Sequence, residues 1–100
     1  MKVLLVGRLG SIIDDVQSQL RTKELELFGA TGIDEVRATL ARTNIDHVIM
    51  GGGLPLEDRL AIVRELFLSS ETTSVHLKDV ASGPEGMLPF ARRVLEGLLR

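Results

Sequence analysis

The sequence contains no cysteine, no tryptophan and no tyrosine, and its three aromatic residues are all phenylalanines. The absence of cysteine excludes disulfides, thiol catalysis and thiolate metal sites, and it is in keeping with a cytoplasmic protein. Few aromatics leave no stacking platform for single-stranded nucleic acid, and the acids and bases are interspersed without a basic stripe. We therefore expect no nucleic-acid partner.

Long apolar runs are also missing from the sequence. The N-terminal run, residues 3–6, is too short for a signal peptide or a membrane span, so we expect no membrane association and a cytoplasmic location. The chain is 44% hydrophobic and 26% charged, with a net charge of −2, which is typical of a soluble globular protein. Its 100 residues predict a single domain, residues 1–100.

Short apolar segments alternate with amphipathic ones along the whole chain. The expected strands are residues 2–6, 25–28, 46–50 and 74–78. The expected helices are residues 12–22, 33–43 and 55–68, followed by a last helix that starts at Pro84 or Pro89. Strict alternation predicts a parallel sheet with helices on both faces. Because Glu24 and Glu26 make the second strand look like an edge, we predict strand order 2-1-3-4, a flavodoxin-like, three-layer, doubly wound α/β domain.

Local signals refine two of these helices. Ser11 is the expected N-cap of the first helix, with Asp14 and Asp15 favourable to the dipole in its first turn. Thr31 or Gly32 is expected to cap the second. In the third helix an apolar face is formed by Leu56, Leu60, Val63 and Phe67, with Ile62 and Leu66 widening it.

Four segments carry the pattern of a known family. Residues 2–7 match a first strand, residues 30–44 the helix before a central strand, and residues 90–99 a final helix. Residues 45–55, IDHVIMGGGLP, parallel a third strand and its Leu-Pro exit. With these segments, which span nearly all of its length, the chain resembles the receiver domain of bacterial response regulators. The resemblance implies a receiver-like signalling module.

The chain departs from the receiver pattern where phosphorylation would occur. Receivers hold Mg²⁺ with an acidic pair after the first strand, where this chain has Gly7 and Arg8. Alignment through Leu54-Pro55 puts Gly51 at the position of the phosphoryl-accepting aspartate. No hydroxyl residue clearly aligns with the one that closes the family's fourth strand, and the fifth strand is missing. Because phosphoryl transfer to a carboxylate needs the carboxylate and a metal, we expect a degenerate pseudo-receiver that is neither phosphorylated nor an enzyme.

Ligand-binding candidates gather at the expected carboxyl ends of the strands, where open α/β sheets bind their ligands. Gly7 and Arg8 follow the first strand, and Lys78 closes the fourth. The third strand ends in three glycines, Gly51, Gly52 and Gly53. Three successive glycines predict a special backbone, whose N–H groups can form an anion-binding nest. Two acids in the next helical turn would repel an anion, and Arg8 would partly offset them.

The first glycine pair also belongs to a pattern similar to a dinucleotide-binding turn, G-x-x-G-x-x-G. Ile13 replaces the third glycine, and the aspartates after Ser11 crowd the helix N-terminus that a pyrophosphate would use. We therefore expect no cofactor.

The two histidines, His47 and His76, fall in expected strands. They lack the convergent partners of a metal site, so we expect packed or hydrogen-bonded residues and no metal. His76 with Lys78 and Asp79 would line the crevice beside the glycines. No serine lies in a nucleophile elbow, and no catalytic residue is predicted.

Two hypotheses for function follow. The leading one is a non-enzymatic, receiver-like signalling or protein-interaction module that forms a homodimer. Loss of a fifth βα unit would leave the fourth strand as an open edge, and open edges pair, so the dimer should bury the fourth strand or the last helix. The alternative is a small-molecule or nucleotide-binding domain that uses Arg8 and the glycine-rich strand ends.

Overall fold

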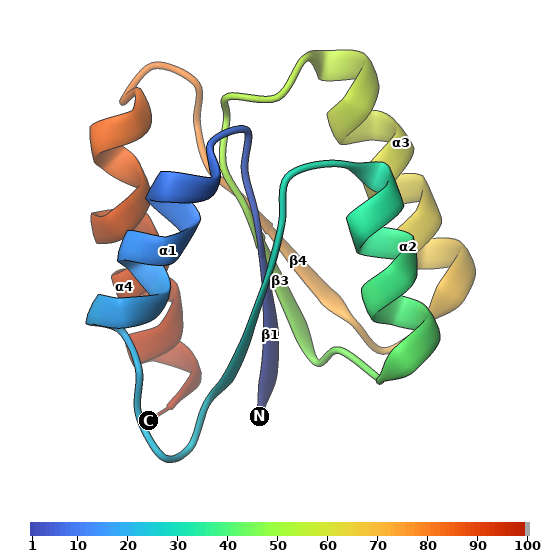
Figure 1. Ribbon diagram of the computed structural model, residues 1–100, viewed down its shortest axis with the longest axis horizontal. Coiled ribbons are helices and arrows are strands. Elements are labelled where there is room, and N and C mark those ends of the chain that lie inside the picture. Colours follow the sequence, from blue (N-terminus) through green and yellow to red (C-terminus); the bar gives the residue numbers. More distant parts are fainter. Residues whose placement is uncertain (100) are drawn as a thin grey trace.

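The computed structural model describes residues 1–99 and contains a four-stranded sheet between two layers of helices (Figure 1). The strands are Lys2–Val6 (β1), Glu26–Ala30 (β2), His47–Met50 (β3) and Ser74–Leu77 (β4). All neighbouring pairs are parallel, in the order β2-β1-β3-β4. The predicted flavodoxin-like α/β architecture and strand order are confirmed, and the described residues form no fifth strand.

Two helices cover each face of the sheet (Figure 1). Helices Gly10–Gln19 (α1) and Met87–Leu98 (α4) lie on one face, and Ile33–Arg42 (α2) and Leu56–Ser69 (α3) lie on the other. A short 3-10 helix, Pro84–Gly86 (η1), leads into α4. The central strands β1 and β3 are shielded on both sides, which explains why their side chains are apolar on both faces rather than alternating.

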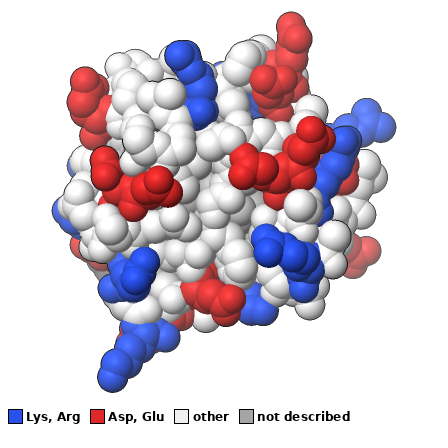
Figure 2. Space-filling model, in the orientation of Figure 1, with Lys and Arg blue, Asp and Glu red and all other residues white. Residues whose placement is uncertain are grey.

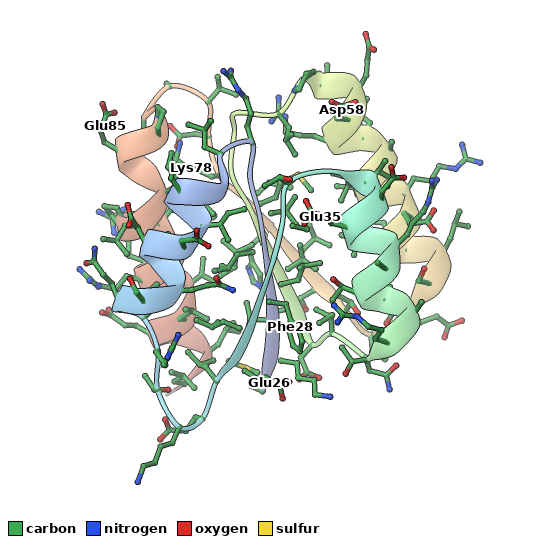
Figure 3. All side chains as sticks on the ribbon, viewed as in Figure 1. Glu26, Phe28, Glu35, Asp58, Lys78 and Glu85 are labelled. Carbon is green, nitrogen blue, oxygen red and sulfur yellow. The ribbon has the colours of Figure 1, made fainter. Side chains whose placement is uncertain are left out.

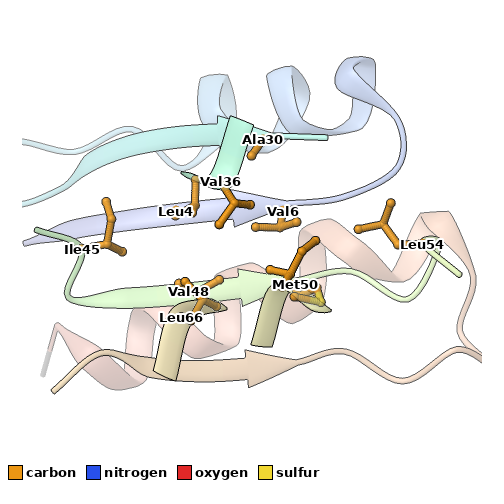
Figure 4. Close-up of a cluster of buried hydrophobic side chains, with 10 residues drawn as sticks. Leu4, Val6, Ala30, Val36, Ile45, Val48, Met50, Leu54 and Leu66 are labelled. Atoms are coloured by element: carbon orange, nitrogen blue, oxygen red, sulfur yellow. The ribbon is translucent and has the colours of Figure 1, made fainter. Parts of the chain in front are cut away.

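Side-chain alternation in β1 and β3 divides the core into two clusters. Figure 4 shows the cluster under α2 and α3, which contains Leu4, Val6, Val48 and Met50 from the central strands. Val3, Leu5 and Ile49 point the other way, toward α1 and α4. Each core therefore depends on its own pair of helices.

Several helix boundaries differ from the sequence predictions. Helix α1 begins at Gly10 with Leu9 as its N-cap, and no side chain caps it, so Ser11 is not the cap. Asp14 and Asp15 consequently lie outside the first turn. The cap of α2 is Gly32, one of the two residues predicted.

The structure also shows where the prolines lie at the helix starts. Pro55 is the N-cap of α3 and not its first helical residue. Pro84 opens η1, and Pro89 lies within the first turn of α4, where its missing N–H breaks no helical hydrogen bond. Both candidate prolines are thus accommodated at one helix start.

Helix α3 turns much of its apolar face outward. The structure buries Ile62 and Leu66, whereas Leu56, Leu60 and Phe67 are each 61% exposed. Successive residues are rotated by about 100°, so these two rows lie on different sides of the helix. Ile62 and Leu66 pack into the core under α2 and α3, and on the α2 side Glu65 of α3 forms an ion pair of 3.4 Å with Arg37.

Charges are interspersed over the surface in Figure 2, with no large patch of one sign on the visible face. Among residues 1–99, no helix combines the length and the apolar composition that crossing a bilayer requires.

Candidate functional site

A cavity of about 310 Å³ lies at the carboxyl ends of β1, β3 and β4. It occupies the switch point of the fold, where the chain leaves β1 for one face and β3 for the other. All six predicted ligand residues line it: Gly7, Arg8, Gly51, Gly52, Gly53 and Lys78. The other lining residues come from the start of α1, the loop after β4 and the start of α4: Leu9, Ile12, Ile13, Val80, Gly83, Pro84 and Met87.

Lys78 is the buried charge of this cavity. It is only 5% exposed, and it lies at the end of the sheet on the side of α1 and α4 (Figure 3). Its Nζ donates to the carbonyl oxygen of Asp79 at 2.8 Å and lies 3.9 Å from Oδ1 of the same residue. Burying an ammonium group is unfavourable unless its donors find acceptors, so the acceptors within reach of Lys78 Nζ decide whether its charge is compensated.

Of the three glycines after β3, Gly52 is explained by close packing, and none is explained by an unusual backbone conformation. None of the three has a positive φ, and among the described residues only Gly83 does, at 67°. A Cβ on Gly52 would lie 2.8 Å from the carbonyl oxygen of Asp79 and 3.1 Å from Cα of Val80. The prediction of a special backbone at these glycines is therefore wrong in its cause, because the loop after β4 lies directly on Gly52.

Arg8 faces the glycines across the cavity mouth. A Cβ on Gly53 would lie 3.4 Å from Cβ of Arg8, and the Arg8 side chain is exposed. The acids that follow in α3, Glu57 and Asp58, do not line the cavity. Asp58 lies on the opposite side of the sheet, near α2 (Figure 3). The acids expected to repel an anion therefore do not face this cavity directly.

The histidines form a pair on the face covered by α4. Nε2 of His76 lies 3.3 Å from Nδ1 of His47, and the two rings are 5.4 Å apart at their centres. Burial lowers the pKa of His76 below 6.5, and His47 lowers it further. The prediction of hydrogen-bonded strand residues is confirmed, but neither His76 nor Asp79 lines the cavity, so that part of the predicted constellation is wrong.

Within residues 1–99, no group of three histidine, aspartate or glutamate side chains is arranged to hold a metal ion.

A second candidate surface lies at the open edge of β4. Leu77 is 54% exposed, and its partner in the sheet is Met50, which belongs to the core under α2 and α3. Leu77 therefore points to the face of the sheet that α3 covers. The sequence predicted the open edge of the fourth strand, but it did not predict that an exposed apolar row of α3 lies on this face. The available signal was that α3 has two apolar rows, more than contact with one sheet requires.

The walls of the cavity were also missed in part, since Val80 and Met87 belong to a segment read only as a loop and a helix start.

Comparisons with protein-family models, with curated proteins and with solved structures found no match to this chain.

Proposed function

We propose that this protein is a non-enzymatic, receiver-like interaction module that works as a homodimer. The observation that carries the proposal is the apolar surface made by Leu77 and the outer row of α3, named here the β4–α3 surface: Leu56, Leu60, Phe67 and Leu77. Large apolar side chains that are exposed on one face of a protein mark sites of protein association.

The free edge of β4 supports pairing with another strand. The N–H groups of Ser74 and Lys78 donate to β3 and its flanks, at Asp46 and Met50. Since successive residues of a strand point their backbone groups to alternate sides, Val75 and Leu77 present theirs to solvent. An edge of this kind is a template for a further strand.

A second copy of the chain fits this edge in one closed arrangement. With a two-fold axis at His76, the two β4 strands would run antiparallel, and Val75 of one copy would pair with Leu77 of the other. These pairs would exchange four backbone hydrogen bonds. Both side chains of each pair would lie on the α3 face, so the outer rows of the two α3 helices would approach across the axis. An isologous contact of this type stops at the dimer.

The interface is tested by sedimentation of the purified protein with substitutions on α3. Leu60→Asp should convert the dimer to a monomer, because it buries a charge in the contact. Leu68→Asp is the matched control, since Leu68 is 73% exposed but lies about 80° around the helix from Leu60. A monomer for the unmodified protein at high concentration, or equal effects of the two substitutions, would contradict the proposal.

The edge itself is tested by Leu77→Lys. A lysine on an edge strand opposes pairing but should leave the monomer folded, because the side chain it replaces is already exposed. Dissociation with an unchanged circular dichroism spectrum is expected. A dimer that persists in both Leu77→Lys and Leu60→Asp would place the contact elsewhere.

The lack of phosphorylation has its own test. Incubation with a small phosphoryl donor and Mg²⁺ should add no acid-labile mass, since Gly51 stands where the receiver pattern has its aspartate. A modified aspartate identified by mass spectrometry would overturn this part of the proposal.

A further inference from the structure

The cavity at the switch point has a charge opposite to that of the chain. Its thirteen lining residues include two cations, Arg8 and Lys78, and no acid, whereas the whole chain carries a net charge of −2. A concave site lined by one sign of charge concentrates ions of the other sign. The cavity is therefore suited to an anion.

Lys78 retains hydrogen-bonding capacity inside this cavity. An ammonium group has three donors, and within residues 1–99 its one hydrogen bond is to the carbonyl oxygen of Asp79. The Asp79 carboxylate, at 3.9 Å, is beyond hydrogen-bond distance and is itself exposed to solvent. Two donors of a side chain that is 95% buried, given its exposed fraction of 5%, are thus left for a ligand.

The backbone around the cavity adds further donors. Gly51 donates its N–H to Val6, but the N–H groups of Gly52 and Gly53 have no acceptor in the described part of the chain. Leu9, the N-cap of α1, lines the cavity, and the first turn of this helix contains no acid and no capping side chain. The aspartates expected to block this helix N-terminus are one turn farther on, so its partial positive charge remains available.

The remaining walls are apolar and lack aromatic residues. Apart from the glycines, they consist of Leu9, Ile12, Ile13, Val80, Pro84 and Met87. The volume of about 310 Å³ is at the small end of ligand cavities, and no ring is present on which a nucleobase could stack. A nucleotide is therefore a poor match, and a compact apolar group is a good one.

We propose that this cavity binds a small organic carboxylate with an apolar body, its carboxylate held by Lys78 and Arg8 and its body against Ile12, Val80 and Met87. The inference goes beyond the interaction module proposed above, and its test is independent of it. No residue of the β4–α3 surface lines the cavity.

The test is an amide-resolved NMR titration with hexanoate at constant ionic strength. Saturable shifts are expected at the amides of Gly7, Gly52 and Gly53. Hexanamide, which has the same body without the charge, and inorganic phosphate, which has charge without the body, should each bind at least about tenfold more weakly. Equal binding of hexanamide would overturn the role of charge, and equal binding of phosphate would overturn the role of the apolar walls.

The residue assignment is tested by Lys78→Met, which keeps an unbranched side chain of similar length. The dissociation constant for hexanoate should rise about tenfold or more, as expected for loss of a hydrogen bond to a charged group. Lys23→Met, at an exposed lysine before β2, is the control and should change nothing. If hexanoate produces no saturable shifts, or if Lys78→Met binds it unchanged, the proposal fails. The comparison with hexanamide decides the question even if Lys78→Met does not fold.

Discussion

Helices α3 and α4 cover opposite faces of the same sheet, yet they differ in how much of their apolar surface is buried. Helix α4 packs its main apolar row, Met87, Ala91 and Leu95, into the core. Helix α3 buries Ile62 and Leu66 and exposes a second apolar row. The difference teaches that an apolar helix face predicts a contact without specifying the partner, which can be the sheet of the same chain or another molecule.

Strand β4 and the residue that follows it show the same contrast. His76 and Lys78 point to the face covered by α4 and are shielded there, whereas Leu77 points to the α3 face and is exposed. A polar residue inside and an apolar residue outside invert the usual preference. Each reversal coincides with one of the two proposed sites.

The largest expected effect separates the two rows of α3. Ile62→Ala should lower the free energy of unfolding by about 2–5 kcal/mol, because it leaves a cavity in the core. Leu60→Ala removes an exposed side chain and should change it by about 0.5 kcal/mol or less. Denaturant titrations at one low protein concentration measure both values, since dimer formation would add a concentration-dependent contribution. Equal losses would mean that the outer row also stabilises the monomer.

An intermediate effect is expected on the face covered by α4. Gly52→Ala should cost about 1–3 kcal/mol, because the new Cβ would lie 2.8 Å from the carbonyl oxygen of Asp79. Gly97→Ala is the control, since nothing lies within 4 Å of its Cβ position in α4 and alanine favours a helix by up to about 1 kcal/mol. Thermal unfolding should therefore shift in opposite directions for the two variants. A neutral Gly52→Ala would show that the loop after β4 moves aside easily.

The smallest effect concerns pH. Burial, together with His47, lowers the pKa of His76 below 6.5, so the unfolded chain takes up this proton more readily than the folded one. Stability should be complete above about pH 6.5 and fall as the pH drops below it. Hydrogen bonds from Thr31 lower the pKa of Glu35 from 4.5, so that carboxylate loses its stabilising effect only at lower pH. The free energy of unfolding, measured by denaturant titration at about pH 5.5 and 7.5, should change more with pH for the protein than for His76→Asn. Equal changes for the two proteins would exclude the histidine pair as the cause of the pH dependence.

The architecture could be predicted from the sequence because it depends on the periodicity of the apolar residues. Alternating strands and helices, with right-handed crossovers, leave few sheet orders, and the glutamates around Leu25 identified the edge. The carboxyl ends of parallel strands converge by construction, so the topology rule also found Gly7, Arg8 and Lys78 without any knowledge of the cavity.

The sequence could not predict the rotation of helix α3 about its axis or the close approach of the chain at Gly52. Which row of α3 faces inward depends on where α2 lies, and a single helix pattern does not contain that information. The reason for Gly52 is a neighbour 27 residues away, the loop at Asp79, and such an approach leaves no local signal. The left-handed conformation of Gly83 was not predicted either, because the three adjacent glycines at 51–53 were the expected place for an unusual backbone.

The pairing of β4 with β3 determines what a one-residue insertion in this strand would do to the two proposed sites. The hydroxyl of Thr73 donates to the carbonyl of Ile45 at 2.7 Å, and the N–H of Ser74 donates to Asp46, which anchors the strand at its start. If that anchor holds, one codon inserted after Ser74 would rotate every later residue to the opposite side. Leu77 would take the place of Lys78 at the cavity, and His76 would take the place of Leu77 on the α3 face. The same insertion in the turn before Thr73 would alter neither, so the two surfaces would be lost together or kept together.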